Sequence, residues 1–160
     1  MAEHRQVIVD LRGRDIFVDE HLADLLVPLW REGCETVFSC QGDEDEAATI
    51  GFVGAEALES ALIWLDNLII EFGDVPMRRR LQQRSEEPGS WGVRAWPRMW
   101  FKSGLHVCPY KEPPGLMYYE LSLPHRDVLV LGAWALHRAG LVTNRIVMND
   151  AQALSEFVVD

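Results

Sequence analysis

Residues 36–42 combine a thiol and a hydroxyl with a tight turn. The β-branched and aromatic residues at the start of this run predict a strand, and Gly42 predicts a turn where the strand ends. Ser39 and Cys40 then offer a hydroxyl and a thiol at the strand end, and the backbone amides of Gln41 and Gly42 can hold an anion. The run therefore indicates a ligand-binding turn with Cys40 as a candidate nucleophile.

A nucleophilic Cys40 requires a neighbouring base that accepts the thiol proton. His106 and His125 are the candidate bases outside the expected helix ends. If the protein is an enzyme, we expect Cys40, Ser39 and His106 at its catalytic centre. A structural turn with a buried cysteine explains the same residues, because free cysteine is commonly buried.

Cysteine and histidine also recur at Cys40, His106, Cys108 and His125. The His-x-Cys spacing places two of these side chains on one face of a strand, as a chelate requires. The four residues do not follow a recognised zinc spacing, so we expect no metal and no cofactor. The acidic run 43–46 lacks the pattern of a calcium loop and is typical of a solvated hairpin tip.

Cationic and aromatic residues alternate within the segment 92–102. At period two their side chains share one face of a strand, where they can stack bases and contact phosphates. The members of this stripe are Arg94, Trp96, Arg98, Trp100 and Lys102. Pro97 favours an edge position for the strand, and the arginine run 78–80 can extend the basic surface. In the alternative arrangement, the tryptophans pack inside and the arginine stems cover them.

Three amphipathic helices are expected from apolar residues at helical spacing. Their expected limits are Asp19 to Gly33, Ala55 to Gly73 and Pro124 to Gly140. Asp19 is a residue type favoured at the helix N-cap, and the two later glycines are typical of helix ends. Pro28 lies inside the first helix and predicts a kink or a new start there.

Strands are expected between and after these helices. Their expected ranges are Glu35–Cys40, Ala48–Val53, Gly92–Lys102, Leu105–Tyr110 and Leu116–Leu123, with a short strand around Ile146–Met148. The first two are separated by a polar stretch and predict a hairpin. Residues 74–90 are expected as a long connection or lid, in which Asp74 and Pro76 can start a short helix.

This order of elements predicts a single α+β domain over residues 1–160. We expect a mostly antiparallel sheet with two to three amphipathic helices packed on one face. The other face of such a sheet can stay open to a ligand, and we place Tyr118 on it with the stripe.

The composition limits the partners of this domain. Twenty-five acidic and fifteen basic side chains give a formal net charge of −10, which opposes non-specific attraction to nucleic acid or an anionic membrane. No stretch is typical of a signal peptide or a spanning helix, and three cysteines do not make a disulfide framework. We therefore expect a cytoplasmic protein with no membrane partner.

A helix, a glycine and a strand ending in Ser-Cys-x-Gly resemble a group of small actinobacterial and phage proteins that carry Ser-Cys-Gln-Gly. This resemblance covers about residues 18–53. More remotely, residues 39–42 are similar to the Thr-Ser-Ser-Cys-Ser-Gly segment of the TYW-three type wybutosine tRNA methyltransferases, and residues 105–107 to their His-Val pair. That family has a basic residue after the glycine, where this chain has Asp43. The resemblance implies a phage or actinobacterial origin and, through the remote family, modification of nucleic acid.

Three functions follow as hypotheses. The first is a binding or host-interaction protein that uses the open sheet face around Trp96, Trp100 and Tyr118 to take a protein partner or single-stranded nucleic acid. The second is a thiol-dependent or nucleic-acid-modifying enzyme centred on residues 39–42. The third is an acidic protein whose negative surface competes for a nucleic-acid-binding partner.

Overall fold

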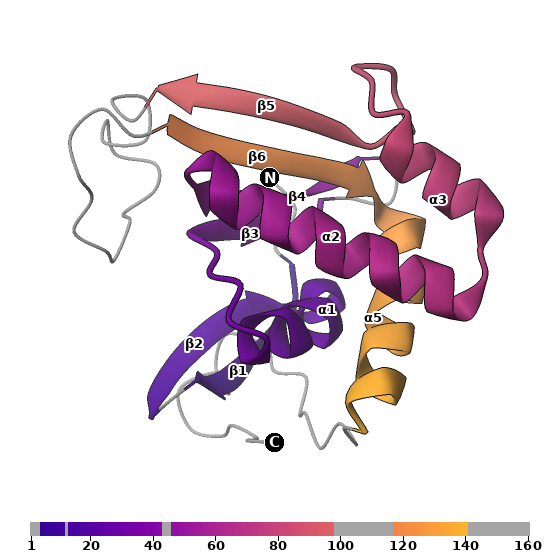
Figure 1. Ribbon diagram of the computed structural model, residues 1–160. Helices are drawn as coiled ribbons and strands as arrows, with labels where there is room; N and C mark the ends of the chain where they lie inside the picture. Colours follow the sequence, from indigo (N-terminus) through magenta and orange to yellow (C-terminus); the bar gives the residue numbers. More distant parts are fainter. Residues whose placement is uncertain (1–3, 12, 43–45, 98–116, 141–160) are drawn as a thin grey trace.

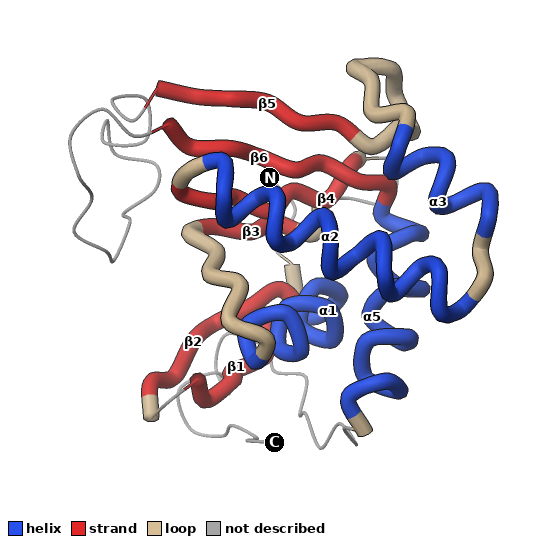
Figure 2. Tube along the Cα trace, viewed as in Figure 1, coloured by secondary structure: helices blue, strands red, loops and turns tan. Residues whose placement is uncertain are grey.

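The computed structural model describes residues 4–11, 13–42, 46–97 and 117–140. This part of the chain contains four helices and two antiparallel sheets, one of two strands and one of four (Figures 1 and 2). The strand expected at 105–110, the second half of the strand expected at 92–102 and the elements expected after Gly140 lie outside the described residues.

The chain opens with a hairpin of β1 (Gln6–Leu11) and β2 (Arg14–Asp19), which pair antiparallel. Gly13 has a φ of 80° in the connection, a conformation that glycine adopts without strain. Val7, Val9 and Val18 are buried in the main core. This hairpin was not among the sequence-based expectations, although alternating apolar residues on both sides of a glycine are typical of one.

Helix α1 (Glu20–Arg31) follows β2 directly, with Asp19 at its N-cap as predicted. Its apolar stripe is buried and consists of Leu22, Ala23, Leu25, Leu26, Pro28 and Leu29. The helix is one element through Pro28, so the alternative of a new start at the proline is wrong. Burial of this leucine stripe fixes α1 against the rest of the fold.

The larger sheet has the strand order β3-β4-β6-β5, and all of its described pairings are antiparallel. Its strands are β3 (Phe38–Cys40), β4 (Ala47–Val53), β5 (Gly92–Pro97) and β6 (Met117–Pro124). The predicted hairpin of β3 and β4 is confirmed, with β3 shorter than expected. Among the described strands, β5 lies at one end of this order, the edge position that Pro97 favoured.

Helices α2 (Ala55–Phe72) and α5 (His125–Ala139) pack on one face of this sheet, against β4 and β6, and α1 packs against α5 (Figure 1). Both helices have the predicted limits and end at glycines in the left-handed conformation, Gly73 and Gly140. The predicted fold class, a mostly antiparallel sheet with helices on one face, is therefore confirmed.

Helix α3 (Val75–Gln82) occupies the segment after α2, where Asp74 and Pro76 favoured a short helix. The Asp74 carboxylate accepts a hydrogen bond of 3.0 Å from the Met77 amide and so caps the helix. The proline stands in the first turn, where its missing amide hydrogen leaves no bond unmade.

The arginine run on α3 is engaged within the fold. Arg78 donates to Asp66 on α2 at 3.0 Å, and Arg80 makes two hydrogen bonds to Asp127 on α5, at 2.9 and 3.0 Å. These pairs attach α3 to its two neighbouring helices. Two of the three arginines therefore do not supply the extra basic surface that was considered for the stripe.

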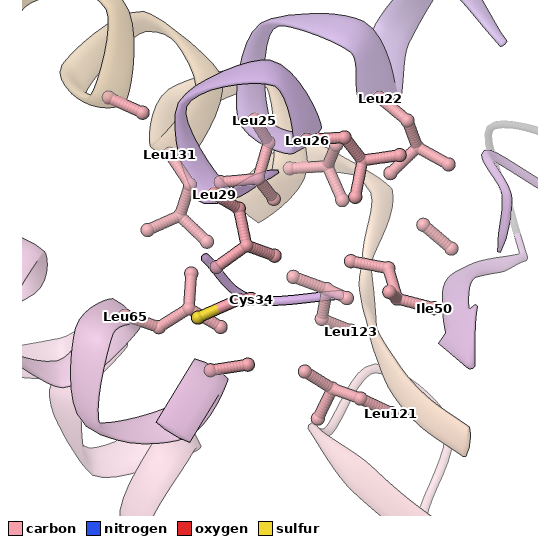
Figure 3. Close-up of a cluster of buried hydrophobic side chains, with 14 of the residues drawn as sticks. Leu22, Leu25, Leu26, Leu29, Cys34, Ile50, Leu65, Leu121, Leu123 and Leu131 are labelled. Carbon is pink, nitrogen blue, oxygen red and sulfur yellow. The ribbon is translucent and has the colours of Figure 1, made fainter. Parts of the chain in front are cut away.

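One hydrophobic core joins both sheets and the helices (Figure 3). It combines the leucines of α1 with side chains of β4, β6, α2 and α5, among them Ile50, Leu65, Leu121, Leu123 and Leu131. Each fully buried side chain of this size contributes about 1.5–3 kcal/mol relative to its exposed state. The core therefore holds the ends of β2 and β3, which carry the candidate site, in fixed positions.

Candidate active site

A thiol, an imidazole and a carboxylate meet where the small hairpin contacts β3; we refer to Cys40, His4 and Asp19 as the Cys40 centre. Cys40 is the last residue of β3, and Asp19 is the last residue of β2. His4 lies just before β1, and the pairing of Gln6 with Asp19 across the hairpin brings it alongside Asp19. Three segments far apart in sequence thus build one cluster.

The distances within the Cys40 centre are those of direct interaction. The Nδ1 atom of His4 lies 3.2 Å from Oδ2 of Asp19 and 3.9 Å from Sγ of Cys40. The Asp19 carboxylate also accepts hydrogen bonds from the Gln41 backbone amide at 2.9 Å and from Nε2 of Gln6 at 3.3 Å. Asp19 is 7% exposed, whereas Cys40 is a free, exposed thiol. A buried acceptor therefore holds an imidazole beside an accessible nucleophile.

The Asp19 carboxylate does not perform the capping role that its position in the sequence suggests. It makes no hydrogen bond to the backbone amides of the α1 first turn, and instead it binds the turn that follows β3 through the Gln41 amide. The Gln41 side chain in turn contacts α1, because its Oε1 accepts a hydrogen bond of 3.0 Å from the His21 backbone amide. Asp19 and Gln41 together fasten the Ser-Cys-Gln-Gly turn to the start of α1.

Asp19 and Cys40 approach the same ring nitrogen of His4. In a Ser-His-Asp arrangement the nucleophile and the carboxylate bind opposite nitrogens, and the carboxylate orients the ring from behind. Here the carboxylate faces the nitrogen that would receive the thiol proton. It can therefore stabilise the imidazolium directly once that proton has moved.

Among the described residues, His4 contacts the Cys40 thiol, and His125, one of the two candidate bases, does not. The Nε2 atom of His125 lies 2.7 Å from Nδ1 of His21, and the two rings meet edge to face. The other ring nitrogen of His125 is buried and has no hydrogen-bond partner among the described residues. His106 and Cys108, the other expected partners, lie outside those residues.

Ser39 and Cys40 occupy opposite faces of β3. Ser39 pairs with the buried Ile50, and Cys40 pairs with Thr49. Ser39 lines a cavity of about 590 Å³ between the small hairpin and residues 33–38. The expectation that Ser39 and Cys40 act at one centre is therefore not supported, since strand alternation separates their side chains.

The other described cysteine provides an internal contrast to Cys40. Cys34 is buried in the core, and burial raises the pKa of its thiol, with the charge of Glu32 acting in the same direction. A thiol whose folded pKa is raised stabilises the fold below its ordinary pKa, and this contribution is lost as the pH rises above that value. Cys34 is therefore protonated at neutral pH and shielded from solvent, whereas the Cys40 side chain is exposed.

The sheet face opposite the helices carries both Cys40, on β3, and the described members of the stripe, Arg94 and Trp96, on β5 at the other end of the strand order. Pairing across the sheet sets Cys40, Thr49, Ser122 and Gly92 in one row, and Phe38, Gly51, Glu120 and Arg94 in the next. Residues of the alternate rows, such as Ile50 and Leu121, point into the core. The stripe and the Ser-Cys-Gln-Gly turn thus belong to one surface.

A groove of about 310 Å³ lies on this face between the sheet and residues 85–90. Its lining includes Thr49, Ser122, Arg94 and Glu120, and its volume is at the lower end of the range for small-molecule sites. Trp96 lies in the adjoining row and donates a 3.2 Å bond to Glu120. The groove reaches Thr49, the cross-strand partner of Cys40, but Cys40 itself is not part of its lining.

Three residues expected on this face require comment. Tyr118 is there, paired with Trp96, but it is 3% exposed and does not offer its ring to a ligand in this conformation. Arg98 and Trp100 lie outside the described residues. Among the described members of the stripe, Arg94 is exposed and Trp96 is half-buried.

His4 and Asp19 are the site residues that the sequence did not reveal. Neither belongs to a motif with Cys40, and the hairpin that positions both was not expected. Asp19 had a conventional explanation as the N-cap of α1. A prediction of the β1–β2 hairpin was the missing step, because its register pairs Gln6 with Asp19 and so brings the nearby residue 4 close to residue 19.

Comparisons with known protein families, with curated proteins and with solved structures found no match. Within the part of the chain that the structure describes, no helix has both the length and the apolar character needed to cross a membrane.

Proposed function

We propose that the protein is a thiol-dependent enzyme in which Cys40 attacks an electrophilic carbon of a small polar substrate held on the open sheet face. The observation that carries this proposal is the contact between the exposed Cys40 thiol and His4, with the Asp19 carboxylate on the same imidazole nitrogen. A nucleophile, a proton acceptor and an anion that stabilises the protonated acceptor are thus present together.

The proposed step uses each member of the Cys40 centre once. The step starts from the His4 tautomer that is protonated on Nε2, in which Nδ1 has a free lone pair. The Cys40 sulfur forms a bond to the substrate carbon, its proton passes to Nδ1 of His4, and the leaving group departs with the electrons of its former bond. The Asp19 carboxylate then faces the imidazolium. Hydrogen bonds from Gln6 and Gln41 hold that carboxylate in place throughout, so the step needs little rearrangement of the protein.

The open face supplies the substrate site in this proposal. The groove that reaches Thr49, the cross-strand partner of Cys40, presents the hydroxyls of Thr49 and Ser122 beside the charges of Glu120 and Arg94. These groups favour a substrate with hydrogen-bonding and charged parts. The proposal joins in one site the binding surface and the thiol centre, which were two separate hypotheses from the sequence.

Capture of an acyl group tests this proposal. We expect p-nitrophenyl acetate to acetylate Cys40 with release of nitrophenolate, measured as a burst at 400 nm (roughly the nitrophenolate absorption maximum) and as one acetyl group by peptide mass spectrometry. His4→Gln should slow acetylation tenfold or more, at the low end of the roughly 10²–10⁴-fold range for general-base catalysis, because the thiol loses its proton acceptor.

Cys34→Ser is the matched control, because Cys34 is a described cysteine that lies in the core. Its burst should equal that of the unmodified protein, and Cys40→Ser should remove the burst. Acetylation that is equally fast in the His4→Gln protein, or that occurs at Cys34 in preference to Cys40, contradicts the proposal.

A further inference from the structure

The three atoms of the Cys40 centre are arranged as ligands of one metal ion. His4 Nδ1, Asp19 Oδ2 and Cys40 Sγ all lie within 4.8 Å of one another. Each residue contributes a different donor element, and each of the three is an ordinary protein ligand of zinc. This set shares only Cys40 with the four residues from which no metal was expected.

The spacing of these atoms matches a tetrahedral zinc site. Ordinary zinc bond lengths to nitrogen, oxygen and sulfur require separations of about 3.3 Å between nitrogen and oxygen and about 3.6 Å between nitrogen and sulfur. The separations here are 3.2 Å from His4 Nδ1 to Asp19 Oδ2 and 3.9 Å from His4 Nδ1 to Cys40 Sγ. The third separation, between Asp19 Oδ2 and Cys40 Sγ, is within 4.8 Å, so side-chain rotation would complete the closure of the three ligands on an ion.

A metal also explains why two electron-rich groups face one nitrogen. Nδ1 of His4 can hold a single proton, so it makes one full hydrogen bond at a time. A cation placed between the three atoms satisfies all of them at once. Oxygen-seeking ions such as Mg²⁺ or Ca²⁺ do not favour a thiol, whereas the mixed nitrogen, oxygen and sulfur set suits Zn²⁺.

The surroundings support such a site. Gln6 and the Gln41 amide hydrogen-bond the Asp19 carboxylate, the kind of support that orients metal ligands in known sites. Cys40 is exposed, so a fourth position can be filled by water from solvent.

We propose that His4, Asp19 and Cys40 bind one Zn²⁺ ion. The bound ion coordinates the Cys40 sulfur and so reversibly inhibits attack of this sulfur on the substrate. Binding forms a bond between zinc and the Cys40 sulfur and releases the thiol proton to solvent. The blocking role rests on the proposed function, whereas the metal site itself stands on the geometry alone.

The test is a titration of metal-free, untagged protein with ZnCl₂ by calorimetry, followed by iodoacetamide labelling of Cys40 with and without zinc. We expect one ion per chain, protection of Cys40 from labelling, and affinity at least about a hundredfold lower in Cys40→Ser and His4→Gln. Cys34→Ser and His21→Ala are matched controls that should bind zinc normally. Circular dichroism checks that each variant is folded.

The other outcomes contradict the metal site or the proposed function. No binding, or unchanged affinity in both Cys40→Ser and His4→Gln, overturns the metal site. Loss of binding in His21→Ala places the ion at the histidine pair of His21 and His125 and likewise overturns it. Zinc binding without acetyl capture by the metal-free protein leaves the metal site standing and contradicts the proposed function. Acetyl capture without zinc binding supports the proposed function and overturns the metal site.

Discussion

Replacement of Asp127 by alanine is expected to lower the free energy of unfolding by about 3 kcal/mol, at the low end of the range for breaking a buried ion pair. Asp127 is 2% exposed and accepts two hydrogen bonds from Arg80 and one of 2.9 Å from the indole nitrogen of Trp91. Trp91 is completely buried, so its indole N–H would lose an acceptor that water cannot replace. The Arg80 side chain is 28% exposed, and this partial solvation limits the loss.

Urea denaturation measures this effect, and Asp66→Ala is the matched control. Asp66 pairs with Arg78 on the same helix α3, but the two side chains are 27% and 43% exposed. Its removal should cost about 1 kcal/mol or less, as for other surface pairs. Equal losses in the two variants would show that burial of Asp127 and its bond to Trp91 do not matter.

The pH dependence of this pair follows from Arg80. The hydrogen bonds to Asp127 raise the pKa of the Arg80 guanidinium, and burial opposes this shift without cancelling it. A base with a raised folded pKa stabilises the fold below its ordinary pKa, and this contribution is lost only as the pH rises through the higher folded value. The contribution of Arg80 should therefore persist to strongly alkaline solution.

Replacement of Gly42 by alanine is expected to cost about 2 kcal/mol or more, through backbone strain of roughly 1–2 kcal/mol together with a steric clash. Gly42 has a φ of 68°, and an added Cβ would lie 2.6 Å from the carbonyl oxygen of Ala47. The turn must shift to relieve this contact. Because the shift moves Cys40 and Gln41 relative to Asp19, acetylation of Cys40 should slow as well.

Gly54→Ala separates strain from clash. Gly54 has a φ of 82°, but an added Cβ meets no atom within 4 Å. The Gly54→Ala substitution should lower the free energy of unfolding by about 1 kcal/mol through backbone strain alone, and it should leave Cys40 reactivity unchanged. If both alanine variants lose the same stability and retain the same reactivity, the turn does not hold the Cys40 centre in place.

The helices were predictable because local signals coincided. In α2, helical spacing of apolar residues, a first-turn glutamate and Gly73 all indicated the same limits. The β3–β4 hairpin was predicted for the same reason, with Gly42 in its turn. The β1–β2 hairpin was not predicted. The predicted fold therefore lacked the element that brings His4 and Asp19 to Cys40.

The candidate site depends on contacts that sequence spacing does not encode. His4 and Cys40 are 36 positions apart and meet only through the packing of the small hairpin against β3. Asp19 was identified as a helix cap from its residue type, yet its carboxylate binds Gln41 across the fold. A cytoplasmic location, a phage or actinobacterial origin and the competing acidic-surface function remain predictions.

The central claim is that His4 makes the Cys40 thiol reactive, and the rate of iodoacetamide alkylation at each cysteine tests it most directly. Peptide mass spectrometry separates Cys40 from Cys34 and from Cys108. We expect Cys40 to react at least about tenfold faster in the unmodified protein than in His4→Gln, with both proteins folded, and Cys34 to remain unlabelled in each. Equal Cys40 rates in the two proteins would contradict the account.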